Sequence, residues 1–249
     1  MESYFLTDTG RVREHNEDSV TIIKNVNDEY LLAVADGMGG HKAGEVASAI
    51  TINHLTDNFK KLETIGDKAT AVNWIREQAE DINNEIFEYT ASHPESKGMG
   101  STLVLAIYTK DFLLFGNVGD SSGFVVKNDE LFKITHDHTL VNLLVKNGEL
   151  TPEEAKNHPK KNILMRALGA NNPIEIDIFD VENNVEGVVL SSDGLTSMLN
   201  NTQIEKVLLA KTGTLEEKVI KLIRKSNVRG GTDNISIACL FTKEGEKEW

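Results

Sequence analysis

Hydrophobic positions in this chain form short apolar runs and longer stretches with helical spacing. The short runs predict strands, at residues 3–8, 18–25, 29–36, 101–109, 112–119, 122–127, 131–134, 174–181, 187–192 and 233–242. Stretches with apolar residues three and four positions apart predict helices, at residues 42–59, 67–92, 201–210 and 214–228. Short connections such as residues 127–130 favour antiparallel hairpins. Paired helices with antiparallel strands predict a layered α+β sandwich.

Acidic residues recur where these predicted strands begin or end. Asp36 follows the apolar run 30–35 and precedes Gly37, Gly39 and Gly40. Glycines let backbone oxygens approach a ligand without an intervening Cβ. The other acidic positions at predicted strand ends are Glu17, Asp18, Asp120, Asp193 and Asp233. Each one is also compatible with an ordinary turn, because Asp is common in turns. Their recurrence favours a shared centre in which cations neutralise the mutual repulsion.

The available ligands narrow the choice of metal. The single cysteine, Cys239, lies in the last apolar strand, where a buried hydrophobic role is expected. The seven histidines include no His-Glu-x-x-His pattern. Oxygen donors therefore dominate, and they favour Mg²⁺ or Mn²⁺.

Oxygen-ligated cations suggest phosphate chemistry. Two cations about 3.5–4 Å apart can activate a shared water and stabilise charge in a phosphoryl displacement. A phosphate also needs a group such as arginine to bind its free oxygens. Arg13 lies four residues before Glu17 and is a candidate. The plain alternative is a solvated surface arginine.

The ordered motifs resemble those of the PPM family, the metal-dependent (type 2C) protein Ser/Thr phosphatases. They are Thr7-Asp8-x-Gly10, Asn16-Glu17-Asp18, Ala35-Asp36-Gly37-Met38-Gly39-Gly40-His41-x-Ala43-Gly44, Gly98-Met99-Gly100-Ser101-Thr102, Asn117-Val118-Gly119-Asp120-Ser121, Thr135-x-Asp137-His138, Leu168-Gly169, Ser192-Asp193-Gly194-Leu195 and Gly231-x-Asp233-Asn234. Each motif is weak alone, but the ordered set is specific. It is most similar to the phosphatases that Gram-positive bacteria pair with eukaryotic-type Ser/Thr kinases.

This resemblance implies a four-layer αββα sandwich, with two central antiparallel sheets flanked by pairs of helices. It implies one phosphatase domain over residues 1–249, with a flap subdomain at about 136–172. Thr151 and Pro152 predict a short helix start inside that flap. An insertion beside a metal site is placed to recognise substrate or to control access.

The resemblance also implies a set of metal ligands. Asp36 would bridge two catalytic Mn²⁺ or Mg²⁺ ions, and the Gly37 carbonyl would bind one of them. Asp193 and Asp233 would hold the metal on the other side. Asp120, with Asp193, would help to form the third metal site of bacterial relatives.

Other matching positions would act around those ions. Arg13 would bind the substrate phosphate, and Glu17 would act through a water molecule on the metal. Asp18 is a supporting acid in this scheme, and Asn234 would orient Asp233.

Three positions are of separate interest. Ser122 stands where family members usually carry Arg after Gly-Asp-Ser, which affects local stability or the positioning of Asp120. Met38 replaces a His proposed as general acid in many eukaryotic members, so the leaving-group proton has no assigned donor. His41 is expected to serve at a helix N-terminus.

Composition limits partners and location. The net charge of −13 disfavours non-specific nucleic-acid binding. The N-terminus lacks a signal-peptide pattern, no apolar run is long enough for a membrane span, and one cysteine suits a reducing cytoplasm. A monomer is expected, with residues 243–249 as a solvated tail.

The resulting hypothesis is hydrolysis of phosphoserine and phosphothreonine on proteins, reversing a cognate Ser/Thr kinase. One alternative is a catalytically silent module that binds a kinase or phosphoprotein, which retention of Asp36, Asp193 and Asp233 disfavours. Another is an oxygen-ligated nuclease or small-molecule phosphatase. The absence of an evident basic face disfavours the nuclease.

Overall fold

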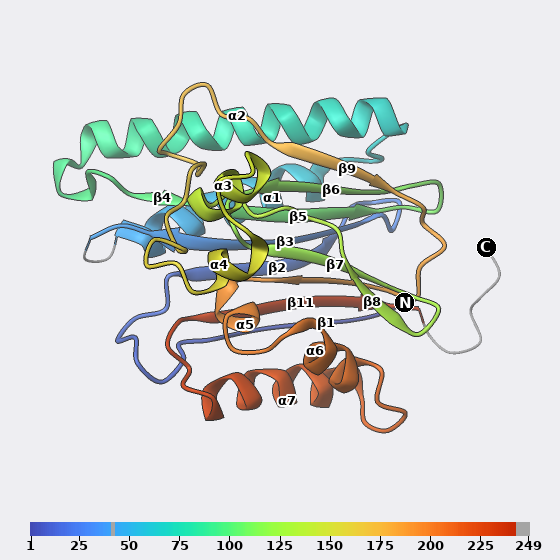
Figure 1. Ribbon diagram of the computed structural model, residues 1–249. Helices are drawn as coiled ribbons and strands as arrows, with labels where there is room; N and C mark the ends of the chain where they lie inside the picture. The colour runs from blue at the N-terminus through green and yellow to red at the C-terminus, as the bar shows by residue number, and fades with distance from the viewer. Residues whose placement is uncertain (41–42, 243–249) are drawn as a thin grey trace.

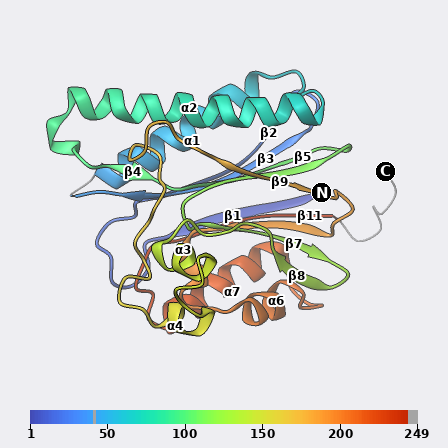
Figure 2. The same cartoon turned by 45° about the horizontal axis from the view of Figure 1, so that its top comes forward.

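The strands form two antiparallel sheets packed face to face between two helical layers in the computed structural model (Figure 1). The structure describes residues 1–40 and 43–242. The expectations for His41 and for residues 243–249 lie outside the described residues. Figure 2 shows the same layers from another angle, with α1 and α2 on one side and α6 and α7 on the other.

One sheet has five strands in the order β1-β11-β10-β7-β8. These are β1 (Glu2–Asp8), β7 (Ser122–Lys127), β8 (Glu130–Lys133), β10 (Gly187–Ser191) and β11 (Ile235–Phe241). Its outer face packs against α5 (Asp193–Thr196), α6 (Asn201–Leu208) and α7 (Leu215–Val228).

The other sheet has six strands, in the order β2-β3-β5-β6-β9 with β4 paired to β3. These are β2 (Asp18–Lys24), β3 (Tyr30–Met38), β4 (Gly100–Ser101), β5 (Leu103–Tyr108), β6 (Leu113–Val118) and β9 (Asp177–Val181). The long helices α1 (Ala43–Lys61) and α2 (Lys68–Ser92) cover its outer face, and the one-turn η1 (Pro94–Ser96) follows α2.

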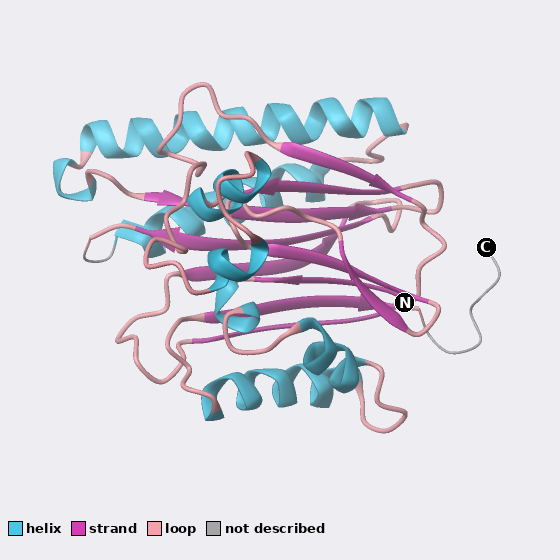
Figure 3. Ribbon diagram, viewed as in Figure 1, coloured by secondary structure: helices cyan, strands magenta, loops and turns pink. Residues whose placement is uncertain are grey.

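Three apolar cores hold the layers together. Leu31 and Ile75 belong to the core between the larger sheet and its helices. Ile237 and Leu222 belong to the equivalent core on the other side. Phe115 packs between the two sheets. The predicted four-layer αββα sandwich is confirmed, and Figure 3 shows the strands enclosed by the helices.

Two predicted strand boundaries were wrong for local reasons. Predicted strand 101–109 is divided at Thr102, because the Asp36 amide donates to the Thr102 hydroxyl (3.0 Å) instead of a ladder carbonyl. Predicted strand 174–181 begins at Asp177, because its partner β6 ends at Val118 and its last pair is Asn117 with Asp177. The short α3, α5 and η1 had no predicted counterpart.

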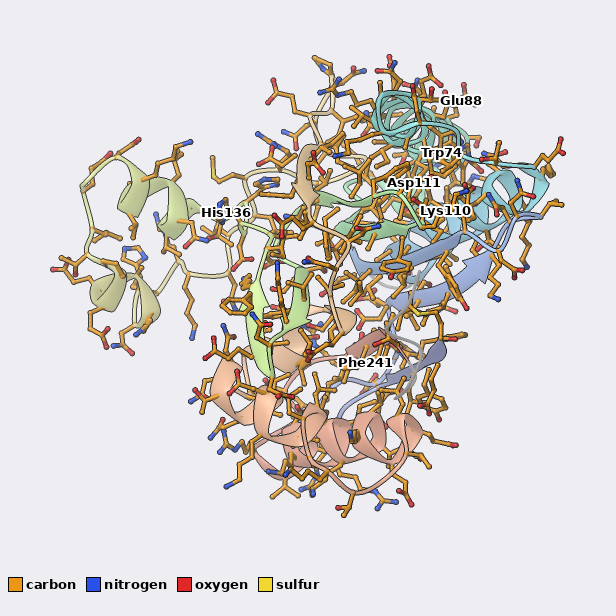
Figure 4. The ribbon with its side chains drawn as sticks, turned by 90° about the vertical axis from the view of Figure 1, so that its right-hand side faces the viewer. Trp74, Glu88, Lys110, Asp111, His136 and Phe241 are labelled. Atoms are coloured by element: carbon orange, nitrogen blue, oxygen red, sulfur yellow. The ribbon has the colours of Figure 1, made fainter. Side chains whose placement is uncertain are left out.

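Residues 136–172 form an excursion between β8 and β9 that contains α3 (Leu140–Lys146) and α4 (Pro152–Lys156). Thr151 caps α4 in a reciprocal capping box with Glu154, which confirms the predicted start of this helix. Figure 4 shows these two helices standing away from the sandwich, with His136 near their base. Within the described residues, no helix combines the length and hydrophobicity needed to cross a membrane.

Candidate metal centre and active site

The recurring carboxylates are close enough to affect one another's pKa, and the end of β3 that carries Asp36 lies on the left in Figure 1. Asp18 opens β2 and pairs in register with Asp36 near the end of β3. Asp193 begins α5 directly after β10, and Asp233 lies just before β11. Asp120 follows β6 at the same end. The strand order therefore converts five distant sequence positions into neighbours.

Burial and mutual repulsion raise the pKa of four carboxyl groups in this cluster, those of Asp18, Asp36, Asp120 and Asp193. For Asp36, burial is the main cause, followed by the charges of Asp18, Asp193 and Asp120, and its pKa lies well above the ordinary value. Burial likewise raises the pKa of Asp18 and of Asp120 to about 7, and that of Asp193 to about 6. A buried cluster of this kind needs protons or cations to be stable at neutral pH.

The donor set fits hard divalent cations. Asp36 and Asp193 lie close enough for each carboxyl group to affect the pKa of the other. Glu17 Oε1 and Asp18 Oδ1 are buried without a hydrogen-bond partner among the described residues. Within residues 1–40 and 43–242, no group of three or more acidic, His or Cys side chains is arranged so that it could hold a metal ion as it stands. The centre is defined by strand register and by mutual effects on pKa.

The backbone around Gly37 packs closely against Gly44 beside this cluster. A Cβ on Gly37 would lie 2.0 Å from the Gly44 carbonyl oxygen, and a Cβ on Gly44 would lie 2.7 Å from Glu17 Oε1. The Gly37 amide donates to the Glu17 carbonyl at 3.0 Å. Only glycine permits this approach between the end of β3 and the first turn of α1. Burial raises the pKa of Glu17, although nearby Arg13 lowers it.

Arg13 lies at the solvent side of the cluster. Its guanidinium donates to Asp233 Oδ2 at 2.7 Å, and its side chain is 47% exposed. Arg13 is therefore anchored to one candidate ligand while much of its guanidinium stays open to a solvent-borne anion.

Asn234 connects three chain segments at this end. Its side chain accepts from the Glu17 amide at 2.8 Å and donates to the carbonyls of Thr9 and His15, both at 2.9 Å. Its contact with Asp233 uses the backbone, since the Asn234 amide donates to Asp233 Oδ1 at 2.9 Å. The side chain thus fixes the loop that carries Arg13 and Glu17.

Sequence reasoning missed several residues that touch the cluster. Thr102 makes a second contact with Asp36, because its amide donates to the Asp36 carbonyl at 2.9 Å. The Ser192 hydroxyl donates to Asp18 Oδ2 at 2.7 Å. Asp137 lies near enough to raise the pKa of Asp120 and Asp193. All three stand in the quoted motifs, which was the available signal.

A second polar cluster joins Asp120 to the 136–172 excursion. The Gly119 amide donates to His138 Nδ1 at 3.1 Å, so the proton of this imidazole resides on Nε2, 3.2 Å from Asp177 Oδ2. Arg166 donates to Asp177 Oδ1 at 2.7 Å and to Glu175 at 3.2 Å. Burial lowers the pKa of His138, which keeps the ring neutral.

His138, Arg166 and Asp177 border a hollow of about 840 Å³ beneath α3. Lys133, His136 and Leu143 line other parts of its wall. Asp137 also lines it and is paired with Lys133 at 2.6 Å. The hollow therefore adjoins the candidate metal centre.

Ser122 and Met38 lie at the same end of the sheets as the candidate metal centre. Ser122 begins β7, opposite Ser191 of β10, and both hydroxyls are buried without a partner among the described residues. Met38 pairs with Gly100 at the edge of β3. Its thioether has no proton to donate.

Comparison with known proteins agrees with this arrangement. Residues 9–225 match the family model described as "Protein phosphatase 2C". The chain belongs to the protein phosphatase 2C family, which confirms the resemblance found in the motifs.

Individual relatives match over nearly their whole length. The chain is 42% identical over 238 residues to "Serine/threonine phosphatase stp" of Listeria monocytogenes, covering 95% of this chain and 94% of that protein. A solved Streptococcus agalactiae serine/threonine phosphatase has a TM-score of 0.91 and 38% identity, covering 97% of this chain and 99% of that one. Stp1 from Staphylococcus aureus also has a TM-score of 0.91, at 36% identity, covering 97% of this chain and 95% of that one.

Proposed function

We propose that this chain hydrolyses phosphoserine and phosphothreonine esters on proteins, and so reverses the action of a Ser/Thr kinase. The observation that carries the proposal is the convergence of the half-buried Asp36, Asp193 and Asp233 beside an exposed, anchored Arg13. Family membership and the named phosphatase relatives support the same reaction class.

The candidate ligands suit two Mn²⁺ or Mg²⁺ ions. Asp36, the Gly37 carbonyl, Asp193 and Asp233 would hold them, and Asp120 with Asp193 would contribute to a third site. When bound, such ions neutralise the carboxylates and activate water for attack on phosphorus. Hard cations with oxygen ligands match this donor set.

The remaining residues would bind the substrate phosphate, hold water or position their neighbours. Arg13 would bind the non-bridging phosphate oxygens, because a guanidinium forms paired hydrogen bonds to phosphate. Glu17 carries an unpartnered buried oxygen and would hold a water molecule by hydrogen bonding. Asp18 supports Asp36 from the neighbouring strand, and Asn234 holds the loop bearing Arg13 and Glu17.

The test is phosphate release from a phosphothreonine peptide with Mn²⁺ or Mg²⁺, and then with excess EDTA. We expect metal-dependent release by the wild type and its loss in Asp36→Ala. Asp57→Ala is the matched control, because Asp57 is an exposed carboxylate on α1. Full activity of Asp36→Ala would overturn the assignment of the site. No release by folded wild-type protein with either metal would favour the non-catalytic binding module.

A further inference from the structure

The layer formed by α6 and α7 differs in charge from the rest of the chain. The whole sequence has 26 Lys and Arg against 39 Asp and Glu. Residues 197–229 reverse this balance, with seven Lys and Arg against three Glu. The three acids, Glu205, Glu216 and Glu217, are engaged with the β8 backbone, with Tyr4 and with the α7 cap respectively. The excess cations are therefore not neutralised by their own layer.

Three of the cations on α7 form a helical stripe together with Val228 and the C-cap residue Arg229. Lys221, Arg224, Lys225, Val228 and Arg229 are spaced as i, i+3, i+4, i+7 and i+8, which places them on one face. All five are exposed, and Val228 is 82% exposed. Within the described residues, no carboxylate forms an ion pair with Lys221, Arg224 or Lys225. We call these five residues the α7 stripe.

The α7 stripe borders a surface groove of about 330 Å³. Leu199 and Gln203 complete its wall. Arg229 is held in the wall by hydrogen bonds to the Met198 carbonyl (3.0 Å) and to Gln203, which leave its charge uncompensated. Lys225 and Arg229 also complement the helix dipole near the C-terminus of α7, but Lys221 and Arg224 lie too far back for that explanation.

The segment that follows Arg229 leads along the chain to the candidate phosphate site. The chain passes from Arg229 through Gly230 and Gly231 to Asp233, which pairs with Arg13. The Arg11 amide donates to the Gly231 carbonyl at 2.8 Å, so the loop carrying Arg11 and Arg13 packs on this segment. Figure 1 shows the C-terminal end of α7 and the loop after β1 at the same end of the molecule. The C-terminal end of the α7 stripe therefore lies on the same side of the molecule as the loop that carries Arg11 and Arg13.

We propose that the α7 stripe binds an acidic segment of the phosphorylated protein substrate, at a distance from the phosphorylated residue. This inference rests on the proposed function and names a substrate class for it. Eight residues of helix separate Lys221 from Arg229, or about 12 Å, which an extended segment of about four residues spans. Exposed Val228 between the cations suits a segment that also carries an apolar side chain.

The test compares two phosphothreonine peptides that differ in a flanking segment of four Glu or four Gln. Because the distance to the phosphothreonine is not fixed, the segment is placed four, eight and twelve residues away on either side. We expect the wild type to show a KM about fivefold lower for the best Glu peptide than for its Gln partner. The kcat should stay the same, and the preference should disappear near 0.5 M NaCl.

The variant Lys221→Ser/Arg224→Ser/Lys225→Ser should lose this preference while keeping the wild-type kcat on the Gln peptide. The matched control is Lys60→Ser/Lys61→Ser/Arg76→Ser, which removes the same charge from exposed positions on α1 and α2 that form no ion pair within residues 1–40 and 43–242. A triple charge reversal to Glu should transfer the preference to a peptide with four Lys. Retention of the Glu preference in the Ser variant, or its loss in the control, would overturn the proposal.

Binding separates this proposal from the proposed function. If the wild type hydrolyses no peptide, the proposed function fails, and the anisotropy of a labelled Glu peptide without phosphate then decides the docking proposal. Stripe-dependent binding of that peptide supports docking, and equal binding by the Ser variant overturns it. Stripe-dependent binding of phosphatidylglycerol vesicles without discrimination between peptides also overturns it, since the ligand would then be a lipid surface.

Discussion

Two clusters of acidic side chains lie within one end of this molecule and are stabilised in opposite ways. In the candidate metal centre, burial and neighbouring carboxylates raise the pKa of Asp36 and its partners. Beneath the 136–172 excursion, burial also acts to raise the pKa of Asp177, but Arg166 and His138 outweigh it and leave the pKa below its ordinary value. In the second cluster Arg166 supplies a counter-charge to Asp177 from the chain itself, whereas the first cluster needs ions from solution.

The two clusters should differ most in how activity and stability respond when one carboxylate charge is removed from each. Asp36→Asn should lower kcat at least about 10³-fold, because interactions with active-site metals are worth several kcal/mol. In EDTA at pH 7.5 the same change should raise the free energy of unfolding by about 1–3 kcal/mol, since it removes a buried, repelled charge. Asp177→Asn should instead lower the stability. Thermal melts in EDTA check the sign, and a less stable Asp36→Asn protein would contradict the comparison.

Metal addition should stabilise the protein, and more so at higher pH. Each raised pKa means that the folded chain binds its proton more tightly than the unfolded chain. Metal-free stability from these groups therefore falls as the pH rises from about 4 toward about 7. Saturating Mn²⁺ should raise Tm by about 5–10 °C at pH 7.5 and by clearly less at pH 5.5, where protons compete.

Melts with and without Mn²⁺ at both pH values measure this effect. Asp36→Asn serves as the control, because it should show a much smaller Mn²⁺ effect. An equal or larger Mn²⁺ effect at pH 5.5 would place the responsible groups outside this cluster.

Removing Arg166, which pairs with Asp177 and Glu175, should have an intermediate effect on stability. Arg166→Ala leaves Asp177 and Glu175 without their shared cation and loosens the contact through His138 to Gly119. We expect the free energy of unfolding to fall by about 1–2 kcal/mol. Lys156→Ala is the control within the same excursion, because its pair with Glu153 is exposed and should be worth less than about 0.5 kcal/mol. Equal losses from urea unfolding would mean that burial does not distinguish the two pairs.

The two clusters also differed in how far sequence could predict them. Asp36 was found because an apolar run bounded by glycines identifies a buried strand end, and the other acids repeated that pattern. His138, Asp177 and Arg166 carry no such local pattern, and they meet only after the chain leaves and re-enters the sheet. Thr102 was missed for a related reason, since its role depends on lying beside Asp36. Short helices such as α3 lack enough turns to show a clear apolar period.

Substitution of Ser122 should have the smallest effect on stability. It tests whether Ser122 supports the acidic cluster. The Ser122 hydroxyl makes no hydrogen bond among the described residues. Ser122→Ala should therefore change the free energy of unfolding by less than about 0.5 kcal/mol, because no hydrogen bond is lost. Ser192→Ala is the contrasting variant, since that hydroxyl donates to Asp18 (2.7 Å) and accepts from the Ser236 amide (2.9 Å). It should cost about 1–3 kcal/mol. An equal loss in Ser122→Ala by urea unfolding would show that the Ser122 hydroxyl also supports the cluster and has a polar role near Asp120.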